Sequence, residues 1–465
     1  MGWTLLAGVW LAKTQSLTTD EGIHVASAYL ALTRGEHRFD PEHPYLFKYL
    51  TALPLLPLNL NLPAEDASLW AMGKPTFYDS WQESREWSDQ WFYQSNNPAE
   101  LMTWLSRLPG VACLLALVWL LYYVGKRWFN DQIGLWAAFL ASFSPVLLAH
   151  GSLTNTDVPL SLTILLALYL FWTFFQNPSK LTALWFGLSI GISLTTKFTG
   201  VLLIPLGLFW LIYTARQKKL RWQTSLLYGV IATGTIWLWI WLIYFGQSPL
   251  QPIGAPPTWQ LDQVNIWFES HGTSLTAVID VLRHLLPSAF VKGMIFSLAG
   301  SAVGRSAFIL GQEHFKGVWY YFPILLLLKT QLILLLILLI GSIRAALSLR
   351  HRPALTPLTV LLLASGGLIL LLSLTSKLNL GIRHLSGFYP LLMLFLAYSI
   401  YHLLSWLSGR WALFATGLII ALTVLPVWFG RNNLLGYTNA LVYPPARAWW
   451  YMGDSNIDWG QQAQT

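Results

Sequence analysis

Long runs of apolar residues recur along nearly the whole chain and constrain its fold more than any other feature. Most are close to the roughly 20 residues that an α-helix needs to cross the hydrocarbon core of a bilayer. The runs are continuous rather than alternating, which disfavours a transmembrane β-barrel. Only 10% of the 465 residues are charged, whereas a soluble domain carries about a quarter charged residues. The sequence therefore predicts an all-α polytopic membrane protein.

The apolar runs predict about eleven transmembrane helices. The first run, residues 1–13, is too short to span a bilayer by itself. It is interpreted either as a short first helix or as a sign that the chain starts further upstream. The other predicted spans cover residues 101–124, 133–149, 157–176, 181–196, 198–214, 223–246, 318–343, 355–374, 382–404 and 411–430.

Two long connections interrupt the predicted spans, at residues 14–100 and 247–317. Within the first, residues 20–34 and 44–58 have the amphipathic helical pattern of helices that lie on a membrane surface. We expect this first loop to carry the catalytic residues.

Basic residues mark one side of the predicted bundle. With the N-terminus in the cytoplasm, every short cytoplasmic connection is basic, as the positive-inside rule requires. These connections contain one acid, Asp131, so the other 19 of the chain's 20 acidic residues lie on the opposite side. We therefore predict a transmembrane module over 1–430, with extracytoplasmic long loops and an extracytoplasmic segment over 431–465. The basic residues of the short connections are Lys126, Arg127, Lys180, Arg216, Lys218, Lys219, Arg221, Arg344, Arg350, Arg352 and Arg410.

Several function classes lack support in the sequence. It contains no P-loop, no dinucleotide-binding fingerprint and no internal repeat of the kind seen in many transporters. The net charge of +8 follows the membrane topology, so no nucleic-acid partner is predicted. The single cysteine, Cys113, precludes an intramolecular disulfide. The absence of Asn-x-Ser/Thr sequons favours a multi-pass protein of a bacterial plasma membrane.

An acidic pair at the membrane surface, Asp20 and Glu21, forms the candidate catalytic site. Glycosyl transfer needs a carboxylate to take the proton of the attacking hydroxyl group. The residues from Thr18 to Glu21 also fit a capping box that opens the first surface helix. We interpret Asp20 as the functional carboxylate and favour the structural cap for Glu21.

Five side chains on the outer side form the candidate binding site for a donor phosphate. His43 and Lys48 bracket the start of the second surface helix, where a cation beside exposed N–H groups suits a phosphate. Lys197 lies at the outer end of two spans, and Arg383 and His384 lie at the outer start of another. Arg383 is favoured because its planar guanidinium matches phosphate. The alternative for these cations is contact with lipid headgroups.

Three further charged residues are candidates for orienting a substrate. Asp157, two residues before Pro159, fits a helix start, so a structural role and an orienting role are both open. Arg305 and Glu313 lie in the second long loop. Because the sequence lacks a Cys/His cluster, we predict no metal site, although an assisting divalent cation is left open.

Two other features have no assigned role. The segment 449–461 is polar and aromatic, which suits either the stacking of sugars or an interfacial cap. Lys329 lies within a predicted span, where an uncompensated charge is disfavoured by about 3 kcal/mol or more.

A set of short motifs follows in order along nearly the whole chain. They are Thr19-Asp20-Glu21, His43-Pro44-x-x-x-Lys48, Thr156-Asp157-Val158-Pro159, Lys197-Phe198-x-Gly200, Tyr320-Tyr321-Phe322-Pro323 followed by Lys329-Thr330, Arg383-His384 with Tyr389-Pro390, and Asp454-Ser455-Asn456-x-Asp458-Trp459-Gly460-Gln461. The ordered set resembles the dolichyl-phosphate-mannose protein mannosyltransferase-like family. This is glycosyltransferase family 39 with its bacterial relatives, and the aminoarabinose lipid A transferases are more distant kin.

The resemblance implies a GT-C fold, with two surface helices of the first external loop over a cavity between the spans. It also implies an inverting, direct displacement of sugar from a polyprenyl-phosphate carrier. Carried over, the role of the base falls on Asp20. The donor phosphate falls to Lys48 and Arg383, with Lys197 or His43 in addition.

We therefore predict a membrane glycosyltransferase whose acceptor is a protein hydroxyl, a lipid or a glycan. Tyr45 and Gln331 stand where the family more commonly has proline, and these departures leave the acceptor open. A transporter of lipid-linked sugars is the alternative, but it would need charges along a continuous path through the membrane. A non-catalytic assembly subunit is a third hypothesis, under which Asp20 would be replaceable.

Overall fold

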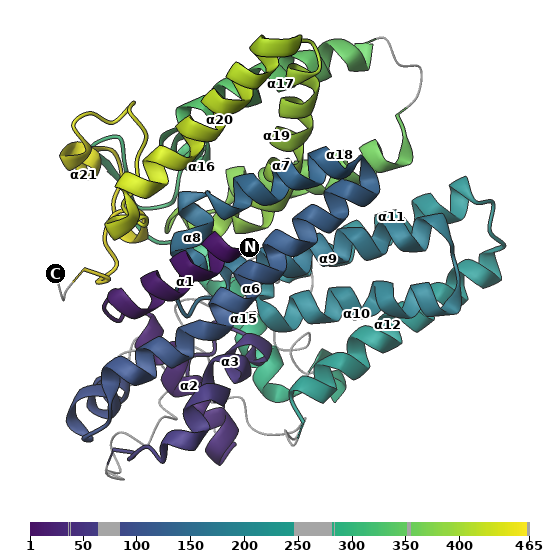
Figure 1. Cartoon of the computed structure of the whole chain (residues 1–465). Coiled ribbons are helices and arrows are strands. Elements are labelled where there is room, and N and C mark those ends of the chain that lie inside the picture. The colour runs from purple at the N-terminus through teal and green to yellow at the C-terminus, as the bar shows by residue number, and fades with distance from the viewer. Residues whose placement is uncertain are drawn as a thin grey trace.

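The computed structural model describes residues 1–35, 37, 39–63, 84–245, 281–282, 284–350 and 355–462. Their regular secondary structure is almost entirely helical, which confirms the predicted fold class (Figure 1). The one described sheet is a hairpin of β1 (Ala307–Ile309) and β2 (Gln312–His314). Parts of both long loops, at 64–83 and 246–280, lie outside the described residues.

Helices occupy all the predicted spans. Four of these spans, 133–149, 198–214, 318–343 and 382–404, are each divided between two helices. The helices are α1 (Gly2–Thr14), α6 (Ala99–Trp128), α7 (Asp131–Ser142), α8 (Pro145–Gly151), α9 (Asp157–Gln176), α10 (Lys180–Thr196), η3 (Phe198–Leu202), α11 (Leu203–Gln217), α12 (Trp222–Ile243), α16 (Tyr321–Lys329), α17 (Leu332–Arg350), α18 (Pro357–Thr375), η4 (Ile382–Phe388), α19 (Tyr389–Leu404) and α20 (Gly409–Phe429).

By length and composition, seven described helices are able to cross a membrane, or eight if the bent pair α7–α8 is one span. The pair bends by 62° where Ser144 and Pro145 interrupt the helix, because proline cannot donate the hydrogen bond that would continue α7. The break between α16 and α17 is stabilised by side-chain hydrogen bonds. There the Gln331 side chain donates to the carbonyls of Phe143 and Thr423.

The first loop forms the two predicted surface helices, α2 (Glu21–Arg34) and α3 (Tyr45–Ala52), the latter continued by the 3₁₀ helix η1 (Leu53–Leu58). Helix α2 ends at Gly35, which has the left-handed φ of 65° that suits glycine. A separate apolar core beneath α2 includes Phe39, Trp87 and Trp91, the last in the π-helix η2 (Gln90–Gln94). These contacts hold the first loop as a folded layer.

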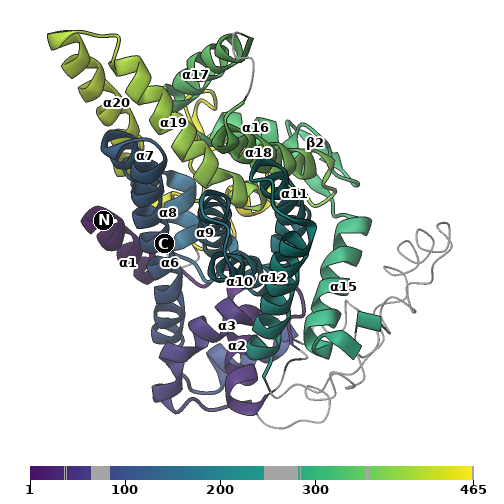
Figure 2. The same cartoon turned by 90° about the vertical axis from the view of Figure 1, so that its right-hand side faces the viewer.

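Helices α9 to α12 run side by side, and Figure 2 views α9 and α10 nearly end-on. Further helices lie outside the predicted spans. Helix α15 (Ser288–Val303) precedes the β hairpin. After α20, the chain forms η5 (Arg431–Asn433), η6 (Pro445–Arg447), α21 (Ala448–Tyr451) and η7 (Asp454–Asn456).

The charged residues singled out in the sequence gather at one end of the helix bundle. Asp20 follows α1, Asp157 begins α9, Lys197 follows α10, and Arg383 lies in η4 just before α19. Lys197 reaches Asp157 at 2.5 Å and Arg383 reaches Asp20 at 3.6 Å. The basic turn between α6 and α7 lies at the opposite end of the 30-residue α6. Alternating helix directions thus bring residues that are distant in sequence to one place.

Candidate functional site

A cavity of about 290 Å³ lies where the first loop, η4 and the C-terminal segment meet. It contains three residues that the sequence predicted for the site, Asp20, Arg305 and Arg383. Among the described residues, its lining is Thr19, Asp20, Arg305, Leu380, Arg383, Asp454, Asp458, Trp459 and Gly460.

Asp20 and Arg383 face each other in this cavity. The carboxylate Oδ2 lies 3.6 Å from Nη2 of the guanidinium, and the two side chains are 26% and 11% exposed. Asp20 occupies the N-cap position of α2 but its side chain caps no backbone N–H group. The Nε atom of Arg383 is buried and has no partner among the described residues. Both groups therefore retain hydrogen-bonding capacity for a bound molecule.

The neighbouring acid, Glu21, is committed to other contacts. It is 1% exposed, and Arg107 donates from Nε to its Oε1 (2.9 Å) and from Nη2 to its Oε2 (2.6 Å). The backbone N–H groups of Thr18 and Thr154 also donate to it. Burial by itself would raise the pKa of Glu21, but Arg107 and these hydrogen bonds hold that pKa below its usual value. The geometry supports a structural role for Glu21, but the predicted capping box is not formed, because Asp20 and not Thr18 is the N-cap of α2.

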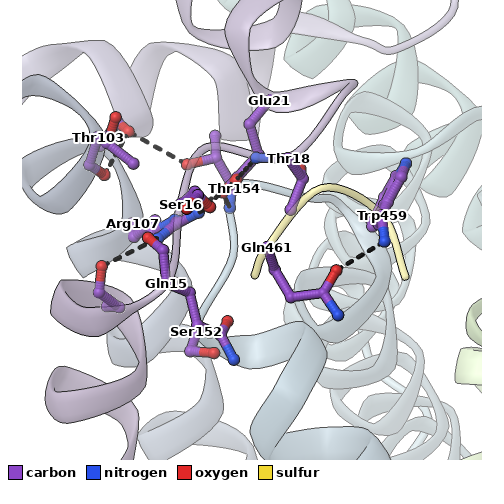
Figure 3. Close-up of polar contacts among 12 residues, drawn as sticks. Gln15, Ser16, Thr18, Glu21, Thr103, Arg107, Ser152, Thr154, Trp459 and Gln461 are labelled. Carbon is purple, nitrogen blue, oxygen red and sulfur yellow. Dashed lines mark hydrogen bonds and ion pairs between the residues drawn. The ribbon is translucent and has the colours of Figure 1, made fainter. Parts of the chain in front are cut away.

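Arg107 is a residue that sequence reasoning missed. Apart from Glu21, its guanidinium donates to three backbone carbonyls, those of Ala12, Gln15 and Ser16 (Figure 3). All five of its N–H donors are therefore used. Arg107 fixes the end of α1 and the start of the loop that leads to Asp20. The available signal was a charged residue inside the apolar run 101–124.

A second buried network lies behind Asp20 and centres on Asp40. Its Oδ2 accepts from Lys48 Nζ at 2.9 Å and contacts His24 Nδ1 at 2.7 Å. Burial would raise the pKa of Asp40, but Lys48 and His24 hold it well below its usual value. Burial would lower the pKa of His24, yet Asp40 raises it. Lys48 is 2% exposed and does not line the cavity.

His43 packs edge-on against His24, with ring centroids 4.8 Å apart. Its Nδ1 atom is buried without a partner among the described residues. Burial, with the charge of His24 nearby, lowers the pKa of His43 well below its usual value. His43 and Lys48 thus belong to one buried cluster, in which Lys48 is held by Asp40, a partner that was not predicted.

The pair of Asp157 and Lys197 forms a third group, next to Arg383. Their side chains are 2% and 10% exposed and lie 2.5 Å apart. The charges of Arg383 and His384 also act on Asp157. Ser161 links α9 to η4 by donating to the carbonyl of Ser386 at 2.8 Å.

The two candidates from the second long loop differ in position. Arg305 lines the cavity and pairs with Glu42 at 3.2 Å. Glu313 is exposed in β2 and is not part of the cavity lining. No group of three or more His, Cys, Asp or Glu side chains within the described residues is arranged to hold a metal ion.

Comparison with known proteins supports the fold. Residues 100–244 match the family model described as dolichyl-phosphate-mannose-protein mannosyltransferase. The chain also superposes on ArnT from Cupriavidus metallidurans, crystallised with undecaprenyl phosphate, with a TM-score of 0.51 and 14% identity. The chain has the GT-C fold. The resemblance noted in the sequence is thereby confirmed.

A second solved structure carries the same fold. It is the Archaeoglobus fulgidus oligosaccharyltransferase tethered to an acceptor peptide, with a TM-score of 0.51 and 12% identity. The superpositions cover 96% and 97% of this chain. They span 66% of the ArnT chain and 55% of the oligosaccharyltransferase chain. A search of curated protein sequences finds no match.

Proposed function

We propose that the protein is an inverting membrane glycosyltransferase that moves a sugar from a polyprenyl-phosphate-linked donor to a hydroxyl group of a protein, lipid or glycan acceptor. The observation that carries this proposal is the cavity in which Asp20 and Arg383 face each other at one end of the helix bundle. A base and a cation in one cavity are the two groups that this reaction needs.

The proposed reaction is a single displacement at the anomeric carbon. The acceptor oxygen attacks the anomeric carbon while the bond from that carbon to the phosphate oxygen breaks. Asp20 takes the proton of the acceptor hydroxyl. The electron pair of the broken bond leaves with the lipid phosphate, whose charge Arg383 stabilises. Because one displacement occurs at the anomeric carbon, its configuration inverts.

Arg383 is the principal phosphate contact in this proposal. Lys48 and Lys197 are already ion-paired, with Asp40 and Asp157 respectively. Arg383 has a buried Nε without a partner among the described residues, and its ion pair with Asp20 is a loose one of 3.6 Å. A planar guanidinium also binds phosphate through two parallel hydrogen bonds. Lys48 and Lys197 then act by fixing the surrounding carboxylates.

The proposed location is the extracytoplasmic face of a bacterial plasma membrane. The cavity lies at the end of the bundle opposite the basic turn between α6 and α7, and short basic connections mark the cytoplasmic side. That the chain adopts a GT-C fold, which ArnT bound to undecaprenyl phosphate shares, supports a polyprenyl-phosphate donor.

The proposal is tested by transfer assays in proteoliposomes with a panel of radiolabelled polyprenyl-phosphate sugars and bacterial membrane acceptors. We expect wild-type protein to label a product and Asp20→Asn and Arg383→Ala to lose this activity. Asp131→Asn, at the opposite end of α6, is the matched control and should transfer normally. Movement of intact donor across the bilayer without transfer would support the transporter instead.

A further inference from the structure

The C-terminal segment Asp454–Gln461 forms one wall of the cavity and contacts both chain segments that supply its charged pair. We infer that this segment is part of the active site and that Trp459 is a positioning residue for Arg383. The inference deepens the proposed function and rests on it, because it assigns to Trp459 the task of presenting Arg383 to the donor phosphate.

The first connection joins the segment to the loop that carries Asp20. The backbone N–H of Thr19 donates to the carbonyl of Trp459 at 2.9 Å, and the N–H of Ser16 donates to the carbonyl of Gln461 at 3.0 Å. The same loop is held on its other side by Arg107 (Figure 3). The backbone just before Asp20 is therefore held by hydrogen bonds both to the C-terminal segment and to Arg107.

The second connection joins the segment to the start of η4, where Arg383 lies. The side chain of Asn456 is 0% exposed and accepts from the backbone N–H of Ile382 at 2.9 Å. Ser455 donates to the carbonyl of Leu380. Gly381 has a φ of 124°, and a Cβ atom there would overlap the Ser455 hydroxyl. This close packing fixes the backbone directly before Arg383.

Trp459 contacts Arg383 itself. The guanidinium carbon lies 3.9 Å from the centroid of the Trp459 ring, within the range of a cation–π interaction. A cation–π contact forms no hydrogen bond, so it does not use the N–H donors of the guanidinium. Trp459 can thus hold Arg383 in place while leaving those donors for a phosphate.

Trp459 is itself fixed by buried contacts. It is 6% exposed, and its backbone N–H donates to Oε1 of Gln461 at 2.6 Å. Gln461 in turn donates to Asn433 at 3.3 Å, and the ring packs near His150. Lys329 supports the same segment, because its buried ammonium group donates to the carbonyls of Asn456 and Leu435. These bonds compensate the Lys329 charge that the sequence left unexplained.

The test compares Trp459→Phe, Trp459→Leu and Trp459→Ala in the donor-dependent transfer assay. A lost cation–π contact of about 0.7–2 kcal/mol corresponds to an increase of about threefold to thirtyfold in the KM for the donor. We expect Leu and Ala to show this increase with little change in kcat, and Phe to restore most of the affinity. Trp449→Ala removes an exposed Trp that does not line the cavity and should behave like wild type.

Binding of radiolabelled polyprenyl phosphate to the purified protein provides a readout without turnover. Weakened binding in Trp459→Leu, at an unchanged unfolding temperature, supports the positioning role. If Trp459→Leu binds like wild type while Arg383→Ala does not, the inference is overturned and the proposed function stands. If wild-type protein transfers sugar from no donor, the proposed function itself fails.

Discussion

Asp20 and Glu21 are adjacent acids, and each faces an arginine, yet their surroundings differ completely. The Glu21–Arg107 pair is closed, with side chains 1% and 0% exposed and contacts of 2.6 and 2.9 Å. The Asp20–Arg383 pair is open, with a single 3.6 Å contact at the edge of a cavity. A closed pair has no donors or acceptors left for a substrate, whereas an open pair has both. The difference separates a structural ion pair from a candidate reacting pair.

The largest effect on stability is expected from removing one partner of the closed Glu21–Arg107 pair. Arg107→Met leaves the Glu21 carboxylate buried without its cation, and removing one partner of a buried pair costs about 3–5 kcal/mol. We expect a clear fall in the unfolding temperature of the detergent-purified protein. Arg383→Met is the matched control and should unfold close to wild type. Equal unfolding temperatures for the two variants would remove the distinction between the pairs.

The sequence was sufficient for the apolar helices and the two helices of the first loop, and its candidates Asp20 and Arg383 do share one cavity. Apolar length predicts a span, and outer-facing charge predicts a site, because both signals are local. It was not sufficient for the partners of these residues. Arg107 meets Glu21 across 86 positions, and Trp459 meets Thr19 across 440. Such contacts depend on how the helices pack, which no local pattern encodes.

The same dependence on helix packing explains why the sequence predicted a phosphate-binding role for Lys48. Its spacing from His43 suggested a phosphate site, and both residues do lie in one cluster. Lys48 is instead ion-paired with Asp40, a residue with a left-handed φ of 44°. An acid in an irregular loop gave no periodic signal that would place it against α3.

A smaller effect on stability is expected from pH, through the titration of His24 and His43 in the network around Asp40. The raised folded-state pKa of His24 contributes stability that is complete below about pH 6.5 and is lost as pH rises through that folded pKa. The lowered pKa of His43 has the opposite sign, because its unfolded form takes up protons below about pH 6.5 and stability falls there. His24→Gln should flatten the alkaline side of a plot of unfolding temperature against pH, and His43→Gln the acid side. Unchanged profiles in both variants would show that these rings do not titrate on unfolding.

The smallest effect is expected at the other end of the bundle. Lys126 and Asp131 form an ion pair at 2.8 Å in which both side chains are exposed. Exposed pairs contribute little because water and salt screen them. We expect Lys126→Gln to leave both unfolding temperature and transfer rate unchanged within error. A marked loss of either would show that ion-pair burial is a poor guide to importance in this protein.

The central claim is that Asp20, and not the acid beside it, reacts with substrate. The most direct measurement is the initial transfer rate per folded molecule, with unfolding temperatures, for wild type, Asp20→Asn and Glu21→Gln. The account predicts that Asp20→Asn unfolds like wild type but transfers about 10²- to 10⁴-fold more slowly, while Glu21→Gln unfolds at a lower temperature. An Asp20→Asn protein that transfers sugar at the wild-type rate would contradict it.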